Sequence, residues 1–401
     1  MSNTVTNHTT SSSVMNIYQR FPLTLVKGKG SFVWDEQGEK YLDYTAGIAT
    51  CNLGHVPKQV QEKITEQLDT LWHCSNLYTI PMQEALATEL TKNSCLDKVF
   101  FCNSGAEANE SAIKLAKKYA KDKGNPEKTE ILTFTNSFHG RTGTTMAATA
   151  QEKIHQGFFP LTPGFHYLPF DDRESLAQID VNRTTAVLLE LVQGEGGVNP
   201  ASLEWVKQLE VLCNKNDILL MVDEIQTGIG RTGTLFAYEQ FGIKPDVITL
   251  AKGLGSGFPV GAMLANEAAA KSFHPGTHGS TFGGNPLAMS AGLATVETIM
   301  NEDILSEVKT KSEWLKAELD DLKSTFSSIE EVRGLGLLLG VQLAFEAGPF
   351  VQKFREKGIL VLMAGPNVLR ILPPLTTTTD ELKHFILVFR QLLTESREFS
   401  L

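Results

Sequence analysis

Two short apolar runs, each followed closely by a charged residue, constrain this chain more than any other feature. The first runs from Ile218 to Asp223, and the second begins at Val247 and leads to Lys252. Continuous apolar runs of this length, bounded by turn residues, are typical of strands that are buried on both faces of a parallel sheet. In open α/β sheets the functional site lies beyond the carboxyl ends of such strands. The sequence therefore predicts that Asp223 and Lys252 lie together at one edge of a sheet.

The rest of the chain continues this alternation of strands and helices. We expect further strands at Glu130–Phe134 and Thr184–Glu190, and a long helix near Ser202–Asn216. Alternation of this kind forms βαβ units and a mostly parallel sheet. The predicted fold class is therefore α/β, with a large domain built on a mostly parallel sheet and a smaller α+β domain.

The pattern of predicted strands and helices changes after a helix that we expect from about Pro286 to Met300. Beyond it we expect one strand over Val332–Leu343, another over Ile359–Leu372 and an amphipathic helix over Asp380–Thr394. A hairpin turn at Asp35–Gly38 is predicted near the N-terminus. The predicted division is a disordered polar tail at 1–13, an N-terminal segment at 14–56 that joins the small domain, a large domain at 57–303 and the small domain at 304–401.

The composition excludes several classes of protein. The 401 residues are 42% hydrophobic and 20% charged, as in an ordinary soluble globular protein. A net charge of -10 argues against a nucleic-acid partner, and no apolar run is long enough for a membrane span. The five cysteines show no C-x-x-C pairing, which predicts a reducing compartment and no metal site. We therefore expect a cytoplasmic protein without nucleic-acid or membrane partners.

The lysine and the acid at the two strand ends suggest a particular cofactor. A lysine that forms a Schiff base, with an aspartate facing a pyridinium nitrogen, is the signature of a pyridoxal-phosphate enzyme. Lys252 is followed by Gly253, Gly255 and Gly257, which let backbone pass close by. An apolar run ending in Asp-Glu also fits the metal-binding strand of an ATPase, but that class needs a G-x-x-x-x-G-K-[ST] loop, which this sequence lacks.

Three glycine-containing loops supply candidate binding groups. Ser104, Gly105 and Ala106 open a predicted helix, where free N–H groups bind anions, although the same residues would also make a plain helix cap. Phe138 can stack on a planar ring, and Arg141 can bind a carboxylate with its forked guanidinium. Both can equally be structural, Phe138 as a core residue and Arg141 as an ion-pair partner. The third loop, HGSTFGGNP, offers the hydroxyls of Ser280 and Thr281 to an anion.

Together these motifs resemble the class III (ornithine-type) pyridoxal-phosphate aminotransferases. The similarity extends from about Asn16 to near the end of the chain. Within the class, the sequence is most similar to the bacterial acetylornithine aminotransferases, while the ornithine, succinylornithine and 4-aminobutyrate enzymes share most of the motifs. The segments that carry the resemblance are FCNSGAEANESAIKLA, FHGRTG, VQGEGG, DEIQTGIGRTG, AKGLGSGFPVGAM, HGSTFGGNP and LRILPPLT.

The resemblance implies a fold-type I architecture and a role for each candidate residue. Lys252 would hold the cofactor and shuttle the proton, and Asp223 would face the ring nitrogen. The other implied cofactor-binding residues are Gln226 at the ring hydroxyl with its neighbours Glu224 and Ile225, Phe138 on the ring, Ser104, Gly105 and Ala106 at the phosphate, and Thr281 at the phosphate of the other subunit's cofactor. That last role implies a homodimer with shared sites.

The resemblance also implies a substrate site and a reaction. Arg141 and Ser280 would receive N2-acetylornithine, and Arg370, near Glu195, would hold the α-carboxylate of glutamate. The amino group would pass to 2-oxoglutarate in ping-pong order. Two residues depart from the family pattern, Leu191 in place of a proline and Ile225 in place of a valine, and both are apolar. A binding protein that kept the fold and lost catalysis is the alternative, but Lys252 and Asp223 are intact.

Overall fold

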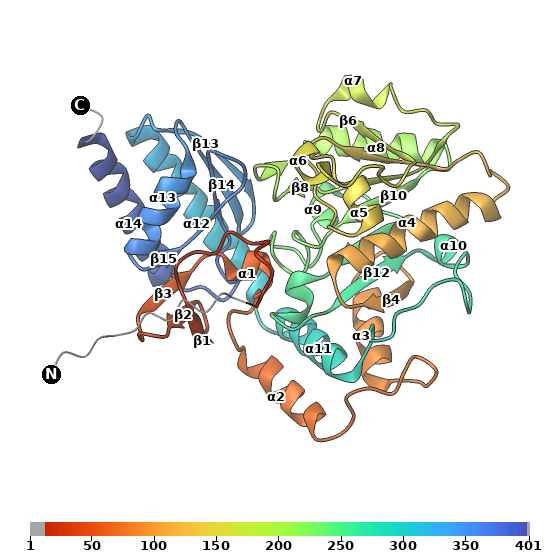
Figure 1. Cartoon of the computed structure of the whole chain (residues 1–401), viewed down its shortest axis with the longest axis horizontal. Helices are drawn as coiled ribbons and strands as arrows, with labels where there is room; N and C mark the ends of the chain where they lie inside the picture. Colours follow the sequence, from red (N-terminus) through yellow and green to blue (C-terminus); the bar gives the residue numbers. More distant parts are fainter. Residues whose placement is uncertain (1–12, 399–401) are drawn as a thin grey trace.

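A seven-stranded sheet forms the centre of this computed structural model, which describes residues 13–398 (Figure 1). All its strands run in one direction except β12, which is antiparallel to both of its neighbours. The predicted tail at 1–13 lies outside the described residues except for its last position. In spatial order the strands are β4 (Lys98–Cys102), β12 (Gly261–Ala265), β11 (Val247–Leu250), β10 (Leu219–Asp223), β7 (Thr184–Leu189), β5 (Glu130–Phe134) and β6 (Phe165–Leu168).

The strands at the middle of this sheet are buried on both faces. Every residue of β7, β10 and β11 is buried, because helices cover both sides of the sheet. This explains why their sequences are apolar without alternation. The prediction of a mostly parallel sheet is therefore confirmed, and the two strands that lead to Asp223 and Lys252 are adjacent and parallel.

Helices from several parts of the chain cover the sheet. The long helix α11 is buried along most of its length, against α2 and α3. A small two-stranded sheet, β8 (Val192–Gln193) with β9 (Asn199–Pro200), follows β7. The helices are α2 (Lys58–Leu68), α3 (Pro81–Lys92), α4 (Gly105–Asp122), α5 (Gly143–Ala148), α6 (Glu152–His155), α7 (Arg173–Leu176), α8 (Leu203–Lys215), α9 (Tyr238–Phe241), α10 (Glu267–Ala270) and α11 (Pro286–Asn301).

Strands from the N-terminal and C-terminal parts of the chain pair beside this body. In Figure 1 the N-terminal strands, in red, lie next to the C-terminal elements, in blue. Strand β3 pairs in parallel with β15, so one four-stranded sheet contains both ends of the chain. Its strands are β1 (Leu25–Lys29), β2 (Phe32–Asp35), β3 (Lys40–Asp43) and β15 (Ile359–Leu360). The predicted hairpin turn at Asp35–Gly38 is confirmed, because it joins β2 to β3. The division into domains at residues 57 and 304 stays a proposal.

Two strand predictions in the C-terminal part were wrong. Val332–Leu343 is not one strand but a hairpin that turns at Gly336, whose φ of 58° is a left-handed conformation suited to glycine. Ile359–Leu372 is broken into three short strands. This part contains the sheet β13 (Ile329–Leu335), β14 (Leu338–Leu343), β17 (Val368–Ile371) and β16 (Leu362–Met363), and the helices α12 (Ile304–Thr325), α13 (Ala347–Glu356) and α14 (Thr379–Glu398).

A buried arginine links the large sheet to both ends of the chain. Arg231 lies in the loop after β10 and is fully buried. Its guanidinium donates hydrogen bonds to the backbone carbonyls of Leu337 and Pro373, and to the side chain of Asn52 at 2.8 Å. Asn52 in turn packs against Gly253, next to Lys252, where a side chain at position 253 would collide with it. The turn that carries Lys252 is therefore fixed by contacts from outside its own sheet.

Among residues 13–398, no helix is both long enough and apolar enough to cross a membrane.

Candidate active site

A cavity of about 410 Å³ opens at the carboxyl ends of β7, β10 and β11. The predicted residues that line it are Ser104, Gly105, Ala106, Phe138, Arg141, Glu195, Asp223, Ile225, Gln226 and Lys252. Residues from five separate stretches of the chain therefore meet at the sheet edge that the apolar runs predicted.

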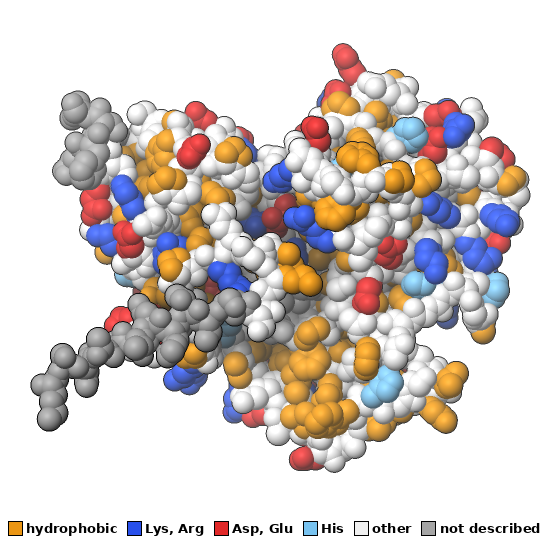
Figure 2. Space-filling view, in the orientation of Figure 1, with side chains coloured by type: hydrophobic (Ala, Val, Ile, Leu, Met, Phe, Trp, Pro, Cys, Tyr) orange, Lys and Arg blue, Asp and Glu red, His pale blue; other side chains and the backbone are white. Residues whose placement is uncertain are grey.

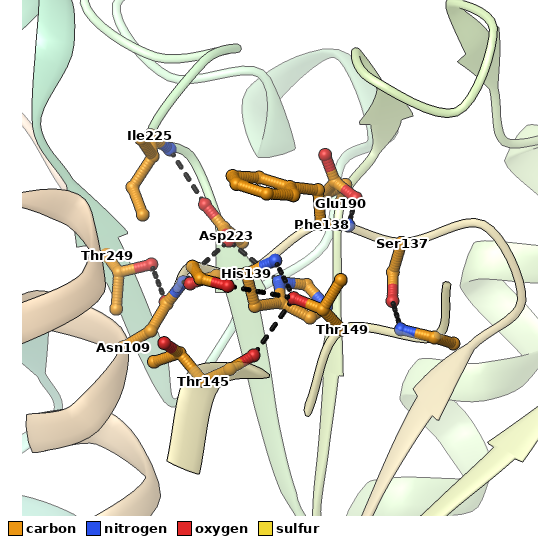
Figure 3. Close-up of polar contacts among 12 residues, drawn as sticks. Asn109, Ser137, Phe138, His139, Thr145, Thr149, Glu190, Asp223, Ile225 and Thr249 are labelled. Atoms are coloured by element: carbon orange, nitrogen blue, oxygen red, sulfur yellow. Dashed lines mark hydrogen bonds and ion pairs between the residues drawn. The ribbon is translucent and has the colours of Figure 1, made fainter. Parts of the chain in front are cut away.

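Asp223 is the last residue of β10, and its carboxylate is held from several sides (Figure 3). One oxygen lies 2.8 Å from both the Asn109 amide nitrogen and the Nδ1 of His139. The other oxygen accepts the Ile225 backbone N–H at 3.1 Å. Asn109 is fixed in turn by Thr249 on the neighbouring strand, whose hydroxyl donates to it at 2.7 Å. A buried carboxylate is costly unless it is hydrogen-bonded, and this network meets that cost.

Lys252 follows β11 and begins a short 3₁₀ turn, Lys252–Gly255, labelled η1. Its φ of 42° lies in the left-handed region, which lysine adopts only when the surroundings impose it. Burial lowers the pKa of its ammonium group, partly offset by Glu195, Asp223 and Glu190. The lowered pKa favours the neutral amine, which is the form that can act as a nucleophile or accept a proton.

The N-terminus of α4 faces the same cavity. Ser104 caps this helix by accepting the Glu107 backbone N–H at 3.2 Å. The N–H groups of the first turn carry the positive end of the helix dipole and suit an anion such as a phosphate. Gly105 leaves the room that this needs, because a Cβ there would lie 2.8 Å from the Ile225 side chain. Both interpretations of these residues therefore apply, since Ser104 is a cap and the helix end also lines the cavity.

Phe138 forms one wall of the cavity, in the loop after β5. Its backbone N–H donates to Glu190 at 2.9 Å, and the guanidinium of Arg141 lies 5.8 Å from the centre of its ring. Arg141 is exposed and also lines the cavity. The Phe138 backbone is therefore held by a hydrogen bond to Glu190, and its ring has a cation–π contact with Arg141.

Glu195 and Arg370 form an ion pair at the cavity wall. The shortest contact, from Nη1 to Oε1, is 2.5 Å, and Nη2 donates to Oε2 at 3.3 Å. Burial alone would raise the pKa of Glu195, but Arg370 outweighs burial and the pKa is lowered. Arg370 is 2% exposed and does not line the cavity itself; its guanidinium also donates to the Gly194 carbonyl at 2.9 Å and to the Gln226 side chain at 3.4 Å.

The structure places four predicted residues outside the cavity wall. Arg370 stands behind Glu195, and Ser280 accepts hydrogen bonds from Asn103 and the Gly283 N–H nearby. Glu224 turns away, with its carboxylate held by the Thr227 hydroxyl and the Tyr238 N–H. Thr281 lies on the exposed surface.

Sequence reasoning gave no role to Asn109, His139, Thr249 or Glu190, which complete the network around Asp223 and Phe138. His139 was visible in the glycine-bounded loop, but nothing in the sequence connected it with Asp223. Asn109 had one signal, because it lies one helical turn beyond the predicted anion-binding residues on α4.

The residues present fit pyridoxal phosphate. A buried carboxylate, an aromatic wall, a lysine and a helix N-terminus with space at Gly105 face one cavity. The Nε2 of His139 is buried without a partner among the described residues. Asp223 would face the ring nitrogen, and Phe138 would lie on the face of the ring. Lys252 would bind the carbonyl carbon, and the first turn of α4 would bind the phosphate.

Comparisons with known proteins agree with this geometry. The class III aminotransferase family model matches residues 14–393. The chain is 63% identical over 385 residues to the acetylornithine aminotransferase of Oceanobacillus iheyensis, covering 96% of each chain. The N-acetylornithine aminotransferase of Stenotrophomonas maltophilia has a similar structure, with a TM-score of 0.83, 38% identity and coverage of 95% and 98%. The ornithine aminotransferase of Toxoplasma gondii superposes with a TM-score of 0.92, at 32% identity and coverage of 96% and 93%.

We predict that Asn109→Ala destabilises the fold strongly. The change removes one of the three donors to the Asp223 carboxylate, and it leaves the Thr249 hydroxyl and the His139 carbonyl without the partner that Asn109 supplies in a fully buried place. Each unsatisfied buried group costs about 1–3 kcal/mol, so we expect a total loss of about 3 kcal/mol or more. Urea unfolding measures it, with Asn199→Ala as control, because the side chain of Asn199 donates to the Gly196 carbonyl from a half-buried position in β9. Equal losses in the two variants would contradict the network.

Proposed function

Because the chain belongs to the class III aminotransferases, we propose that it moves the distal amino group of N2-acetylornithine to 2-oxoglutarate. The products are N-acetylglutamate 5-semialdehyde and glutamate. The observation that carries the proposal is the cavity in which Lys252 faces Asp223, with the Glu195–Arg370 pair at its wall. Ornithine, succinylornithine and 4-aminobutyrate are the alternative amino donors.

Pyridoxal phosphate is the cofactor of this class, and its protonated ring stabilises negative charge that develops on a substrate carbon. Asn109 and the Ile225 N–H hold the Asp223 carboxylate where it would face the ring nitrogen. Lys252 would hold the cofactor. Its Nζ, with the pKa lowered by burial, would then take a proton from the substrate carbon and return it one position away.

The substrates pose a problem of charge. Glutamate carries a carboxylate next to its reacting amine, and the reacting end of acetylornithine carries none. An open Arg370 would suit glutamate but would remain unpaired beside acetylornithine, which is costly in a buried place. In this structure Arg370 is closed by Glu195. We infer that the pair opens for glutamate, while Arg141 at the mouth holds the carboxylate of acetylornithine.

We further propose a cytoplasmic homodimer. Figure 2 shows hydrophobic side chains gathered over α2 and the segment that follows it. Trp72 is 62% exposed and Leu77 is 88% exposed, on a loop whose Asn76 donates to the carbonyls of Ser280 and Gly283. Thr281 lies on the same loop pair, at the surface and away from this chain's own cavity. An exposed apolar face of this kind is typical of an interface. If a second copy bound there, Thr281 would lie at the phosphate of that copy's cofactor.

The first test is a substrate panel with 2-oxoglutarate as the amino acceptor. We expect kcat/KM with N2-acetylornithine to exceed that with ornithine, succinylornithine and 4-aminobutyrate by at least about tenfold, since an acetyl-specific contact of about 1.4 kcal/mol gives that factor. Lys252→Ala is the control and should have no measurable turnover with any donor. A higher value for another donor would replace acetylornithine in the proposal, and turnover by the lysine variant would overturn the mechanism.

The second test separates the two halves of the reaction. Glu195→Ala leaves Arg370 permanently open, so the glutamate half-reaction should hold its rate or improve. The acetylornithine half-reaction should slow by about tenfold or more, because an unpaired buried charge costs more than 1.4 kcal/mol. Single-turnover absorbance of the cofactor measures both halves, and Glu195→Gln, which keeps the shape, should show a smaller effect in the same direction. Equal slowing of both halves would rule out the switch.

The third test concerns the apolar face. Leu77→Lys puts a charge on the proposed interface and should give monomers without activity. Leu387→Lys is the matched control, since Leu387 is 65% exposed on α14, away from this face. Sedimentation velocity and turnover measure the two effects together. A dimer that survives Leu77→Lys with full activity would place the interface elsewhere.

A further inference from the structure

Glu190 is a buried carboxyl that the mechanism above does not use. It follows the last residue of β7, is 7% exposed and lines the cavity. One of its oxygens accepts the Phe138 backbone N–H at 2.9 Å. In Figure 3 no dashed line reaches its other oxygen. Within residues 13–398, the Phe138 N–H is its only hydrogen-bond donor.

The other two carboxylates of the cavity have partners of a different kind. Glu195 is paired with the guanidinium of Arg370 at 2.5 Å. Asp223 is held by His139 and Asn109, both at 2.8 Å. Glu190 forms no ion pair in the described part of the chain and receives one neutral donor. A buried carboxyl without a cationic partner is more stable with a proton than without one.

On balance, the charged groups that face Glu190 also raise its pKa. These groups are Asp223 at the end of β10, Lys252 in the turn after β11 and Glu195 in the loop after β8. Burial raises its pKa most, and Asp223 and Glu195 raise it further. The Phe138 N–H and Lys252 lower it, but the net pKa lies well above the ordinary value.

We propose that Glu190 is a positioning residue that works as a neutral carboxylic acid. One oxygen accepts the Phe138 N–H and so fixes the aromatic wall, and the other presents an O–H donor to the cavity. A neutral group has a clear advantage in this place. A third buried negative charge would repel Asp223 and would also repel the carboxylates of the substrates, a consequence that rests on the proposed function.

Stability as a function of pH tests the protonation without any need for activity. In the unfolded chain Glu190 ionises near its ordinary pKa of about 4.3, while in the folded enzyme it keeps its proton. Between these two pKa values the folded state binds more protons, so the wild type loses stability as the pH rises. Glu190→Gln is permanently neutral and keeps both hydrogen-bonding directions, so it does not incur this loss.

We therefore expect the stability of the Glu190→Gln holoenzyme, relative to that of the wild type, to increase as the pH rises from 5 to 7. The ratio of their unfolding equilibrium constants should change by up to about tenfold per pH unit. Glu381→Gln is the matched control, because Glu381 also accepts a backbone N–H, from Thr378 at 2.9 Å, but lies at the start of α14 outside the cavity. That control should show no such growth with pH.

The proposal would be overturned if the difference in unfolding free energy between Glu190→Gln and the wild type stayed constant across this pH range. Glu190 would then be ionised in the folded enzyme. The positioning role has its own readout. Glu190→Gln should keep the absorbance spectrum of the bound cofactor, whereas Glu190→Ala should shift it, because the Phe138 N–H loses its acceptor. If both variants shift the spectrum equally, a neutral acceptor is insufficient and the proposal fails. If the substrate panel fails while the stability trend holds, only the proposed donor is wrong.

Discussion

The hydrogen bonds around the Asp223 carboxylate are the interaction on which the site depends. A charge this deeply buried is stable only if several donors face it. The donors come from α4, from the loop after β5 and from the backbone just beyond β10, so each element must be in place before the charge is satisfied. The same contacts set the position of His139, and hence of the neighbouring Phe138. Satisfying one charge therefore fixes much of the cavity wall.

The two glutamates of the cavity show how neighbouring groups set the pKa of the same kind of side chain. Glu190 is buried and Glu195 is partly buried, and burial by itself would raise the pKa of each. Arg370 reverses that effect for Glu195, and among residues 13–398 no cation forms an ion pair with Glu190. One glutamate is thereby suited to exchange partners with an anionic substrate, and the other to hold a backbone N–H without adding charge. The cavity keeps a low net charge while still containing three carboxyl groups.

The sequence predicted the residues that end strands and begin helices, and missed those that act through burial. Asp223 and Lys252 were predictable because apolar runs end beside them, and Gly105 because it opens a helix. Asn109 and Thr249 lie inside regular elements, where a polar residue gives no sign of whether it faces solvent or a charge. The turn at Gly336 was missed because the apolar pattern continues across it; in the structure Gly336 has a φ of 58°, and a Cβ there would collide with the Thr232 backbone. Long-range contacts, which no local pattern contains, decided these cases.

The pairing of β3 with β15 has a consequence for the order in which the protein assembles. Leu42 pairs with Ile359, the Tyr44 N–H donates to the Leu360 carbonyl, and the Leu372 N–H donates to that of Tyr44. These partners are separated by more than three-quarters of the chain, and contacts between such distant residues form late and slowly. On the ribosome, the first strands to emerge must wait for nearly the last ones before their sheet is complete. A chain cut short before residue 359 would leave the edge of β3 exposed and free to pair with other chains.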